Sequence, residues 1–108
     1  MSSISLSLEE NGLYAEISGE IDHHSAKLLR DELDRACERH APEVLYIDLT
    51  HVSFMDSSGI GLVLGRHRFM EKLGGKTAVV VPEGRVRRIL TMAAADRFVR
   101  IYDKREDI

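Results

Sequence analysis

The sequence predicts an α/β fold, with a mixed, mostly parallel sheet of about five strands, opened by an antiparallel hairpin and packed against helices. Segments with the period of a strand alternate with segments of helical period, and an Asn-Gly pair separates the first two strands. Strands separated by helices usually pair in parallel, because the helix carries the chain back before the next strand begins. The expected order is β-β-α-β-α-β-α-β, in one domain spanning residues 1–108.

The opening hairpin is predicted from alternation. Ser3–Glu9 carries an apolar residue at every second position, and Leu13–Ser18 does the same beyond Asn11-Gly12. A period of two is typical of a half-buried strand, and Asn-Gly is the strongest short hairpin signal. Gly19–Asp22 is expected to break the second strand.

A helix and a central strand should follow. The helix is expected to begin within Asp22–Ser25, because Asp and Ser side chains accept hydrogen bonds from the free amides of a helix N-terminus. Pro42 should end it, and Val44–Leu49, rich in β-forming residues, should form the central strand. Helical spacing predicts that the buried stripe consists of Ala26, Leu29, Leu33, Ala36 and Cys37.

The second half continues the alternation. A second helix is expected over Ser58–Leu73, closed by Gly74-Gly75, because glycine accepts the left-handed conformation common after a helix. Thr77–Val81 should be a strand, Pro82-Glu83 should start a third helix, and Phe98–Tyr102 should be the last strand. The expected inward residues are Ile60, Val63, Leu64 and His67 on the second helix, and Val86, Ile89, Leu90 and Met92 on the third.

Composition narrows the class of function. The chain lacks a run of eighteen apolar residues and a signal-like N-terminus, so neither a transmembrane helix nor secretion is expected. Its single cysteine, Cys37, cannot form an internal disulfide, which fits the reducing cytoplasm. The net charge of −3 is mixed along the chain, and the one basic cluster, Arg85, Arg87 and Arg88 beside Glu83, is interpreted as a solvated helix face. We expect a monomer with no nucleic-acid or membrane partner.

Function is expected in two loops that leave the carboxyl ends of strands, Gly19–Ser25 and His51–Gly59. The second loop contains Asp56-Ser57-Ser58-Gly59. A helix cap needs one side chain, yet three polar residues stand together. The apolar pair Phe54-Met55 should anchor the loop in the core and hold the hydroxyls in place.

Ser57 is therefore predicted to be a phosphorylation switch. A phosphoryl group there would carry about −1.5 to −2 charges at neutral pH. It would face the free amides of the second helix, near the positive end of the helix dipole, so the fold would tolerate it. A partner that fits a neutral serine would have to desolvate a dianion next to Asp56, or meet it with its own carboxylate. Modification is thus expected to abolish binding without a change of fold.

Catalytic and metal sites are not predicted. The five histidines lack a His-x-x-x-His spacing, which argues against zinc. Gly59, Gly61 and Gly65 match neither a P-loop nor Gly-x-Gly-x-x-Gly, and such small residues let a helix pack or dock closely. A hydrolase would need a base beside Ser57, with Asp22, His24 and His51 as candidates, but a Gly-x-Ser-x-Gly elbow is missing. The expected protein is not an enzyme.

Two segments resemble the anti-sigma factor antagonists, which are single STAS domains. They are Gly-Glu-Ile-Asp-His-His-Ser-Ala at residues 19–26 and Ser-Phe-Met-Asp-Ser-Ser-Gly-Ile-Gly at residues 53–61. The resemblance covers about residues 4–103, and Leu64-Gly65-Arg66 is similar to the sporulation branch of these bacterial phosphoproteins.

The resemblance implies a partner-switching cycle in transcription regulation. The unmodified chain would bind an anti-sigma factor, itself a nucleotide-bound serine kinase, and release the sigma factor. The kinase would phosphorylate Ser57, and a metal-dependent serine phosphatase would restore it. ATP and its metal belong to the kinase, so this chain would need no cofactor. The implied contact surface consists of Asp22, His23, Asp56, Ser57, Ser58, Gly59, Ile60 and Leu64.

Two alternatives and two departures accompany this resemblance. The chain could instead be a general stress antagonist of another sigma factor, or a STAS scaffold that is not phosphorylated. Ala93-Ala94-Ala95 stands where the family commonly has a glycine after the third helix, so that helix end should be built differently. The family usually continues into a C-terminal helix, which should be short or absent here before Ile108 and leave one side of the sheet less covered.

Overall fold

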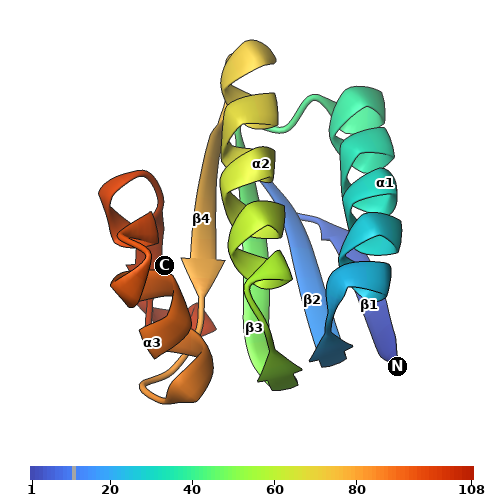
Figure 1. Ribbon diagram of the computed structural model, residues 1–108. Helices are drawn as coiled ribbons and strands as arrows, with labels where there is room; N and C mark the ends of the chain where they lie inside the picture. The colour runs from blue at the N-terminus through green and yellow to red at the C-terminus, as the bar shows by residue number, and fades with distance from the viewer. Residues whose placement is uncertain (11) are drawn as a thin grey trace.

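The computed structural model describes residues 1–10 and 12–108, and over these residues it shows a five-stranded sheet with three α-helices (Figure 1). The sheet order is β1-β2-β3-β4-β5; β1 and β2 are antiparallel, and each later strand joins in parallel. The predicted fold class and element order are confirmed. The elements are β1 (Ser2–Leu8), β2 (Gly12–Ile21), α1 (His23–His40), β3 (Val44–Met55), α2 (Ser58–Lys72), β4 (Lys76–Val80), α3 (Arg85–Met92), the 3-10 turn Ala95–Arg97, β5 (Arg100–Tyr102) and the 3-10 turn Arg105–Asp107.

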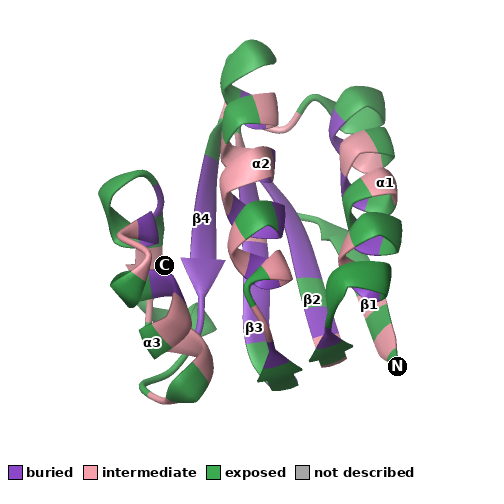
Figure 2. Ribbon diagram, in the orientation of Figure 1, coloured by how far each residue is buried: buried purple, intermediate pink, exposed green. Residues whose placement is uncertain are grey.

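The core lies between the sheet and the helices. Figure 1 shows α1 and α2 side by side in front of the sheet, with α3 at its edge beyond β4. Leu33 of α1, Val63 of α2 and Leu90 of α3 are fully buried in one cluster with the apolar residues of the strands. Figure 2 shows the central strands buried and the outer surfaces of the helices exposed. Within residues 1–10 and 12–108, none of the helices combines the length and apolar character needed to cross a bilayer.

On the opposite face of the sheet, the last residues of the chain contact the sheet at Tyr14. Tyr14 on β2 donates a hydrogen bond to the buried carboxylate of Asp48 on β3. The guanidinium of Arg105 lies 3.9 Å above the centre of the Tyr14 ring and 2.7 Å from a carboxylate oxygen of Glu9. The expected short C-terminal helix is thus a single 3-10 turn, and an arginine side chain covers Tyr14.

Two strands are longer than predicted, and both corrections concern the expected functional loops. β2 and β3 remain paired as far as Ile21 and Met55. Gly19–Asp22 therefore does not break β2, and His51–Met55 is strand, so the second loop is confined to residues 56 and 57. Gly19 adopts φ +91°. The pairing of β2 with β3 shifts register twice near it, between Glu16 and Ser18 and again after Gly19, and then continues.

The helices differ from the prediction mainly in the faces they bury. α2 turns Leu62, Val63 and Met70 inward, whereas Ile60, Leu64 and His67 are only half-buried. α3 starts after Gly84, not at Pro82, and its last residue, Met92, is 86% exposed. The short helix ends there, and Ala94 at φ +60° turns the chain away, so Met92 faces solvent. The last strand, β5, begins at Arg100 and not at Phe98, whose side chain is exposed. The predicted Asn11-Gly12 turn includes Asn11, which lies outside the described residues.

Candidate functional site

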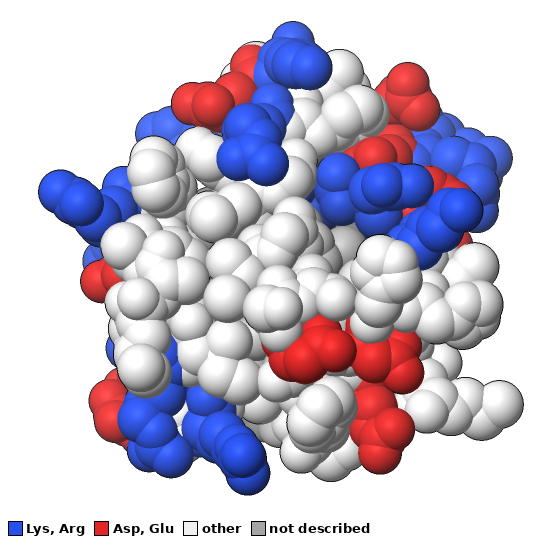
Figure 3. All heavy atoms as spheres, viewed as in Figure 1, with Lys and Arg blue, Asp and Glu red and all other residues white. Residues whose placement is uncertain are grey.

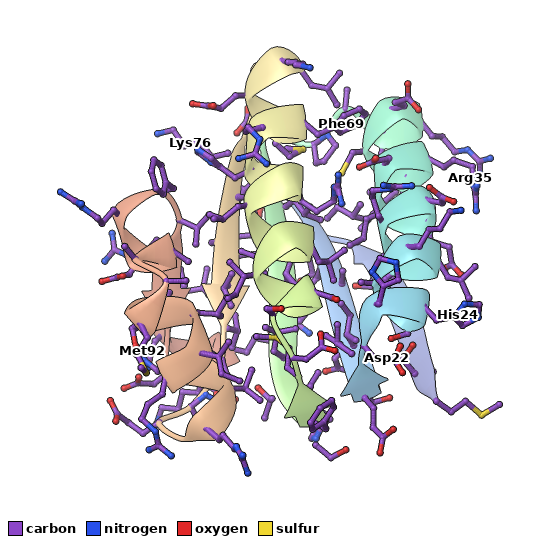
Figure 4. All side chains as sticks on the ribbon, in the orientation of Figure 1. Asp22, His24, Arg35, Phe69, Lys76 and Met92 are labelled. Carbon is purple, nitrogen blue, oxygen red and sulfur yellow. The ribbon has the colours of Figure 1, made fainter. Side chains whose placement is uncertain are left out.

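The candidate site lies where two neighbouring strands end and two helices begin. Ile21 of β2 pairs with Met55 of β3, and the amide of Asp56 donates to the carbonyl of Ile21 at 3.2 Å. Asp22 and Asp56 therefore follow adjacent strands at the same edge of the sheet. Figure 4 shows Asp22 at the foot of α1, at the end of the sheet where α2 also begins.

Asp22 forms the N-cap of α1, which begins at His23, within the predicted range Asp22–Ser25. Its Oδ1 accepts a hydrogen bond from the Ser25 amide at 2.9 Å, and the Ser25 hydroxyl accepts one from the Asp22 amide at 2.9 Å. This reciprocal pair is a capping box. The bond from the Ser25 amide, followed by the Ser25 hydroxyl, holds the pKa of Asp22 below its ordinary value. An ionised carboxylate is therefore held at an exposed position beside the exposed His23.

Asp56 caps the start of α2 with its side chain. Its Oδ1 accepts from the Ser58 amide at 2.8 Å. Ser57 has helical backbone angles, φ −62° and ψ −17°, and its side chain makes no capping hydrogen bond. Its side chain is exposed. The Asp56 carboxylate therefore caps the helix, and the Ser57 hydroxyl is not needed as a cap.

The expectation of free amides around a phosphoryl group is wrong. The Ser58 amide donates to the Asp56 carboxylate, the Gly59 amide to the Asp56 carbonyl at 3.0 Å, and the Ile60 amide to the Ser57 carbonyl at 3.1 Å. The first turn of α2 is thus already hydrogen-bonded. A phosphoryl group on Ser57 would lie next to the Asp56 carboxylate, where the amides of residues 58–60 are already bonded and the helix dipole still favours its charge.

The pair Phe54-Met55 does not anchor the loop as expected, because only Met55 is buried. Phe54 is 48% exposed, whereas Met55 is 4% exposed and packs beneath α2. A Cβ atom on Gly59 would lie 2.2 Å from the Met55 sulfur. Gly59 is buried, and because it has no side chain, the start of α2 can pack directly on Met55 at the end of β3.

Ile60 and Leu64 extend the site along the side of α2 that faces away from α1. Both are half-buried. Leu64 lines a cleft of about 300 Å³ with His67, Arg68, Glu71 and Phe98, and the rings of His67 and Phe98 are 5.8 Å apart between centres. The structure thus brings Asp22, His23, Asp56, Ser57 and Ser58 to one end, with Ile60 and Leu64 beside them.

A larger groove, of about 630 Å³, opens between α1 and α2 and includes Ser58 in its lining. We call it the α1–α2 groove. The sequence reasoning missed it, because its cations come from two helices far apart along the chain. The spacing of Lys27 and Arg30, three residues apart on α1, is a weak sequence signal for it, whereas Arg66 and Arg68, two residues apart, give none. The full lining is His23, Ala26, Lys27, Arg30, Ser58, Gly61, Leu62, Gly65, Arg66 and Arg68.

The histidines considered for catalysis lie on regular elements near this end. His24 is on α1, His51 is on β3, and both are exposed. Over the described ranges, 1–10 and 12–108, no group of three or more His, Cys, Asp or Glu residues could hold a metal ion.

Comparison with known proteins identifies the family. The STAS domain model matches residues 6–108. The chain is 37% identical over 91 residues to an anti-sigma F factor antagonist of Paenibacillus polymyxa, covering 84% of this chain and 78% of that protein. It is 34% identical over 97 residues to an anti-sigma-B factor antagonist of Bacillus subtilis, covering 90% and 87%. The chain belongs to the STAS domain family.

Solved structures show the same fold. Unphosphorylated SpoIIAA, an anti-sigma factor antagonist, matches with a TM-score of 0.81 at 28% identity, covering 97% of this chain and 92% of that one. Phosphorylated SpoIIAA from Bacillus matches with a TM-score of 0.73 at 27% identity, covering 97% and 96%. The fold of this chain is therefore similar to both states of that protein.

Proposed function

We propose that this chain is an anti-sigma factor antagonist whose binding is switched off by phosphorylation of Ser57. The observation that carries the proposal is the exposed Ser57 hydroxyl, which the helix does not use because Asp56 supplies the cap. The antagonists among the relatives, and the phosphorylated form of SpoIIAA among the similar structures, support the same assignment.

The proposed partner is an anti-sigma factor that is also a serine kinase with bound nucleotide. It would contact Asp22, His23 and the motif at residues 56–58, with Ile60 and Leu64 at the flank, and it would transfer a phosphoryl group to Ser57. Gly59, which was expected in this surface, is buried against Met55 and is left out of it. A metal-dependent serine phosphatase would remove that group. The chain itself acts as a regulator, not as an enzyme, and ATP with its metal enters with the kinase.

Release of the partner follows from charge. The phosphoryl group adds about −1.5 to −2 charges next to the Asp56 carboxylate, which is held in place by the Ser58 amide. A complementary surface would have to desolvate this group or face it with like charge, which costs several kcal/mol. A loss of about 2.8 kcal/mol already weakens binding a hundredfold.

The test is phosphorylation by the cognate anti-sigma kinase with ATP, followed by intact mass and binding measurements. We expect one added phosphate, none on Ser57→Ala, and one on the matched control Ser58→Ala. The phosphorylated chain should bind the kinase at least about a hundredfold more weakly. Phosphate found on Ser58, or unchanged affinity after phosphorylation, would contradict the proposal. Binding without any modification would identify a scaffold.

The anti-sigma-B factor antagonist among the relatives favours a second candidate, an antagonist in the general stress pathway. The chemistry at Ser57 would be the same, and only the partner would differ. Binding measured in parallel against an anti-sigma F factor and an anti-sigma-B factor separates the two candidates.

A further inference from the structure

The α1–α2 groove has a lining unlike the rest of the chain. Four Lys or Arg residues and one histidine line it, and no carboxylate does so among the described residues, although the chain carries a net charge of −3. Figure 3 shows Lys and Arg side chains gathered on the upper part of this face, with some acidic side chains among them and others lower down, where the helices begin. The groove thus attracts negative charge.

Two of these cations have internal partners and two have none, although one of the latter, Arg68, also lines the Leu64 cleft on the other side of α2. Arg66 is 6% exposed, and its Nε lies 2.7 Å from Asp34 Oδ1 on α1, so this pair joins the two helices. Arg30 lies 3.4 Å from its neighbour Asp31. Lys27 and Arg68 take part in no ion pair with the residues that the structure describes. Their charge is available to a molecule in the groove.

Two glycines in the lining, Gly61 and Gly65, also indicate that another molecule binds in the groove. A Cβ atom on Gly61 or Gly65 would meet nothing within 4 Å, and both glycines have helical backbone angles within α2. Glycine in the interior of a helix is less favourable than alanine. Packing within this chain therefore gives no reason for glycine at either position, whereas close approach of another backbone to α2 would.

We propose that the α1–α2 groove receives an acidic segment of the anti-sigma partner, with its carboxylates at Lys27 and Arg68 and its backbone against Gly61 and Gly65. This inference rests on the proposed function and names the chemistry of the contact. The groove is continuous with the switch, since Ser58 lines it and Ser57 precedes Ser58. Phosphate on Ser57 would place negative charge at the end of the groove, where it repels the acidic segment.

The experiment measures binding of the full chain to its cognate ATP-loaded anti-sigma factor by calorimetry. Lys27→Glu/Arg68→Glu should weaken binding at least about tenfold and should flatten its dependence on salt. The matched control Arg85→Glu/Arg88→Glu makes the same charge change on exposed positions of α3 and should alter affinity less than about threefold. Thermal unfolding verifies that both variants fold.

A second variant tests the glycines without a charge change. Gly61→Ala/Gly65→Ala should leave the melting temperature equal or higher, because alanine favours helix, and yet should weaken binding. A native chain that binds no anti-sigma factor would overturn the proposed function and this inference with it. Native affinity in both the charge and the glycine variants would overturn the groove alone. Chemical-shift changes along the groove with ATP by itself would identify a small-anion site and would also overturn it.

Discussion

At the scale of single residues, some polar side chains of the site stabilise the helices, and one, Ser57, does not. Asp22 and Asp56 each accept a hydrogen bond from a helix amide, and these bonds fix the carboxylates in place. The neighbouring Ser57 has the residue type of a cap but makes no capping bond. Residue type alone does not separate these tasks, because Asp and Ser are both favoured as caps. The backbone angles of Ser57 decide between them.

Phe54 is the residue at this end that we expect to add most to partner binding. It is 48% exposed and pairs with Glu20 at the end of β3, one residue pair before Ile21 and Met55. Exposed aromatic side chains that become buried at an interface often contribute about 2 kcal/mol or more. Phe54→Ala should therefore weaken anti-sigma factor binding by about thirtyfold, measured by calorimetry.

The matched control for Phe54 is Met92→Ala. Met92 is 86% exposed on α3, away from the serine motif, and its removal should leave affinity unchanged. Both variants should unfold close to the native melting temperature, because neither side chain is part of the buried core. Equal affinity of Phe54→Ala and Met92→Ala would exclude Phe54 from the interface.

At the scale of elements, α2 is the part of the molecule on which the site depends. Its inner face packs against β3 and β4, its first turn presents the serines, and its glycines occupy two different environments. Gly59 is buried against Met55, whereas Gly65 lies open in the α1–α2 groove. The same substitution is therefore expected to have opposite effects at these two positions.

Gly59→Ala should lower the free energy of unfolding by about 1–3 kcal/mol, because the added methyl group overlaps the buried Met55 side chain. Gly65→Ala should raise it by up to about 1 kcal/mol, through the better helix propensity of alanine. Urea unfolding of the two variants beside the native chain measures both changes. A stabilised Gly59→Ala would show that Met55 repacks freely and that the glycine is not needed for packing.

At the scale of the whole molecule, the two faces of the sheet are stabilised in different ways. The helix face is an apolar core, whereas the other face contains the buried hydrogen bond from Tyr14 to Asp48 under the Arg105 guanidinium. Burial, followed by the bond to Asp48, raises the pKa of Tyr14. The neutral phenol is thus favoured in the folded state, so its contribution is present below pH about 10 and is lost as the pH rises through the folded pKa.

Stability of the native chain should therefore fall more steeply above pH about 10 than that of Tyr14→Phe. At neutral pH the variant should be less stable by about 1–3 kcal/mol, because it leaves a buried oxygen of Asp48 without its donor. Urea unfolding between neutral pH and pH about 11 measures both effects. Parallel pH profiles for the two proteins would show that Tyr14 is not the group responsible.

Local signals in the sequence were enough to predict the element order, the start of α1 within Asp22–Ser25, where it begins at His23, and the start of α2 at Ser58. Capping residues, glycines and hydrophobic periods act over a few neighbouring residues, so a single chain segment contains the information. The Asp-Ser-Ser-Gly motif at a helix start was predicted for the same reason.

Only the tertiary structure decided how far β2 and β3 extend and which face of α2 is inward. It also decided that Phe54 is exposed beside a buried Met55, and that cations from α1 and α2 line one groove. These features depend on pairing and burial between residues far apart along the chain. No local propensity encodes them, because the free energy of strand pairing and side-chain burial is set by the neighbours that the fold supplies.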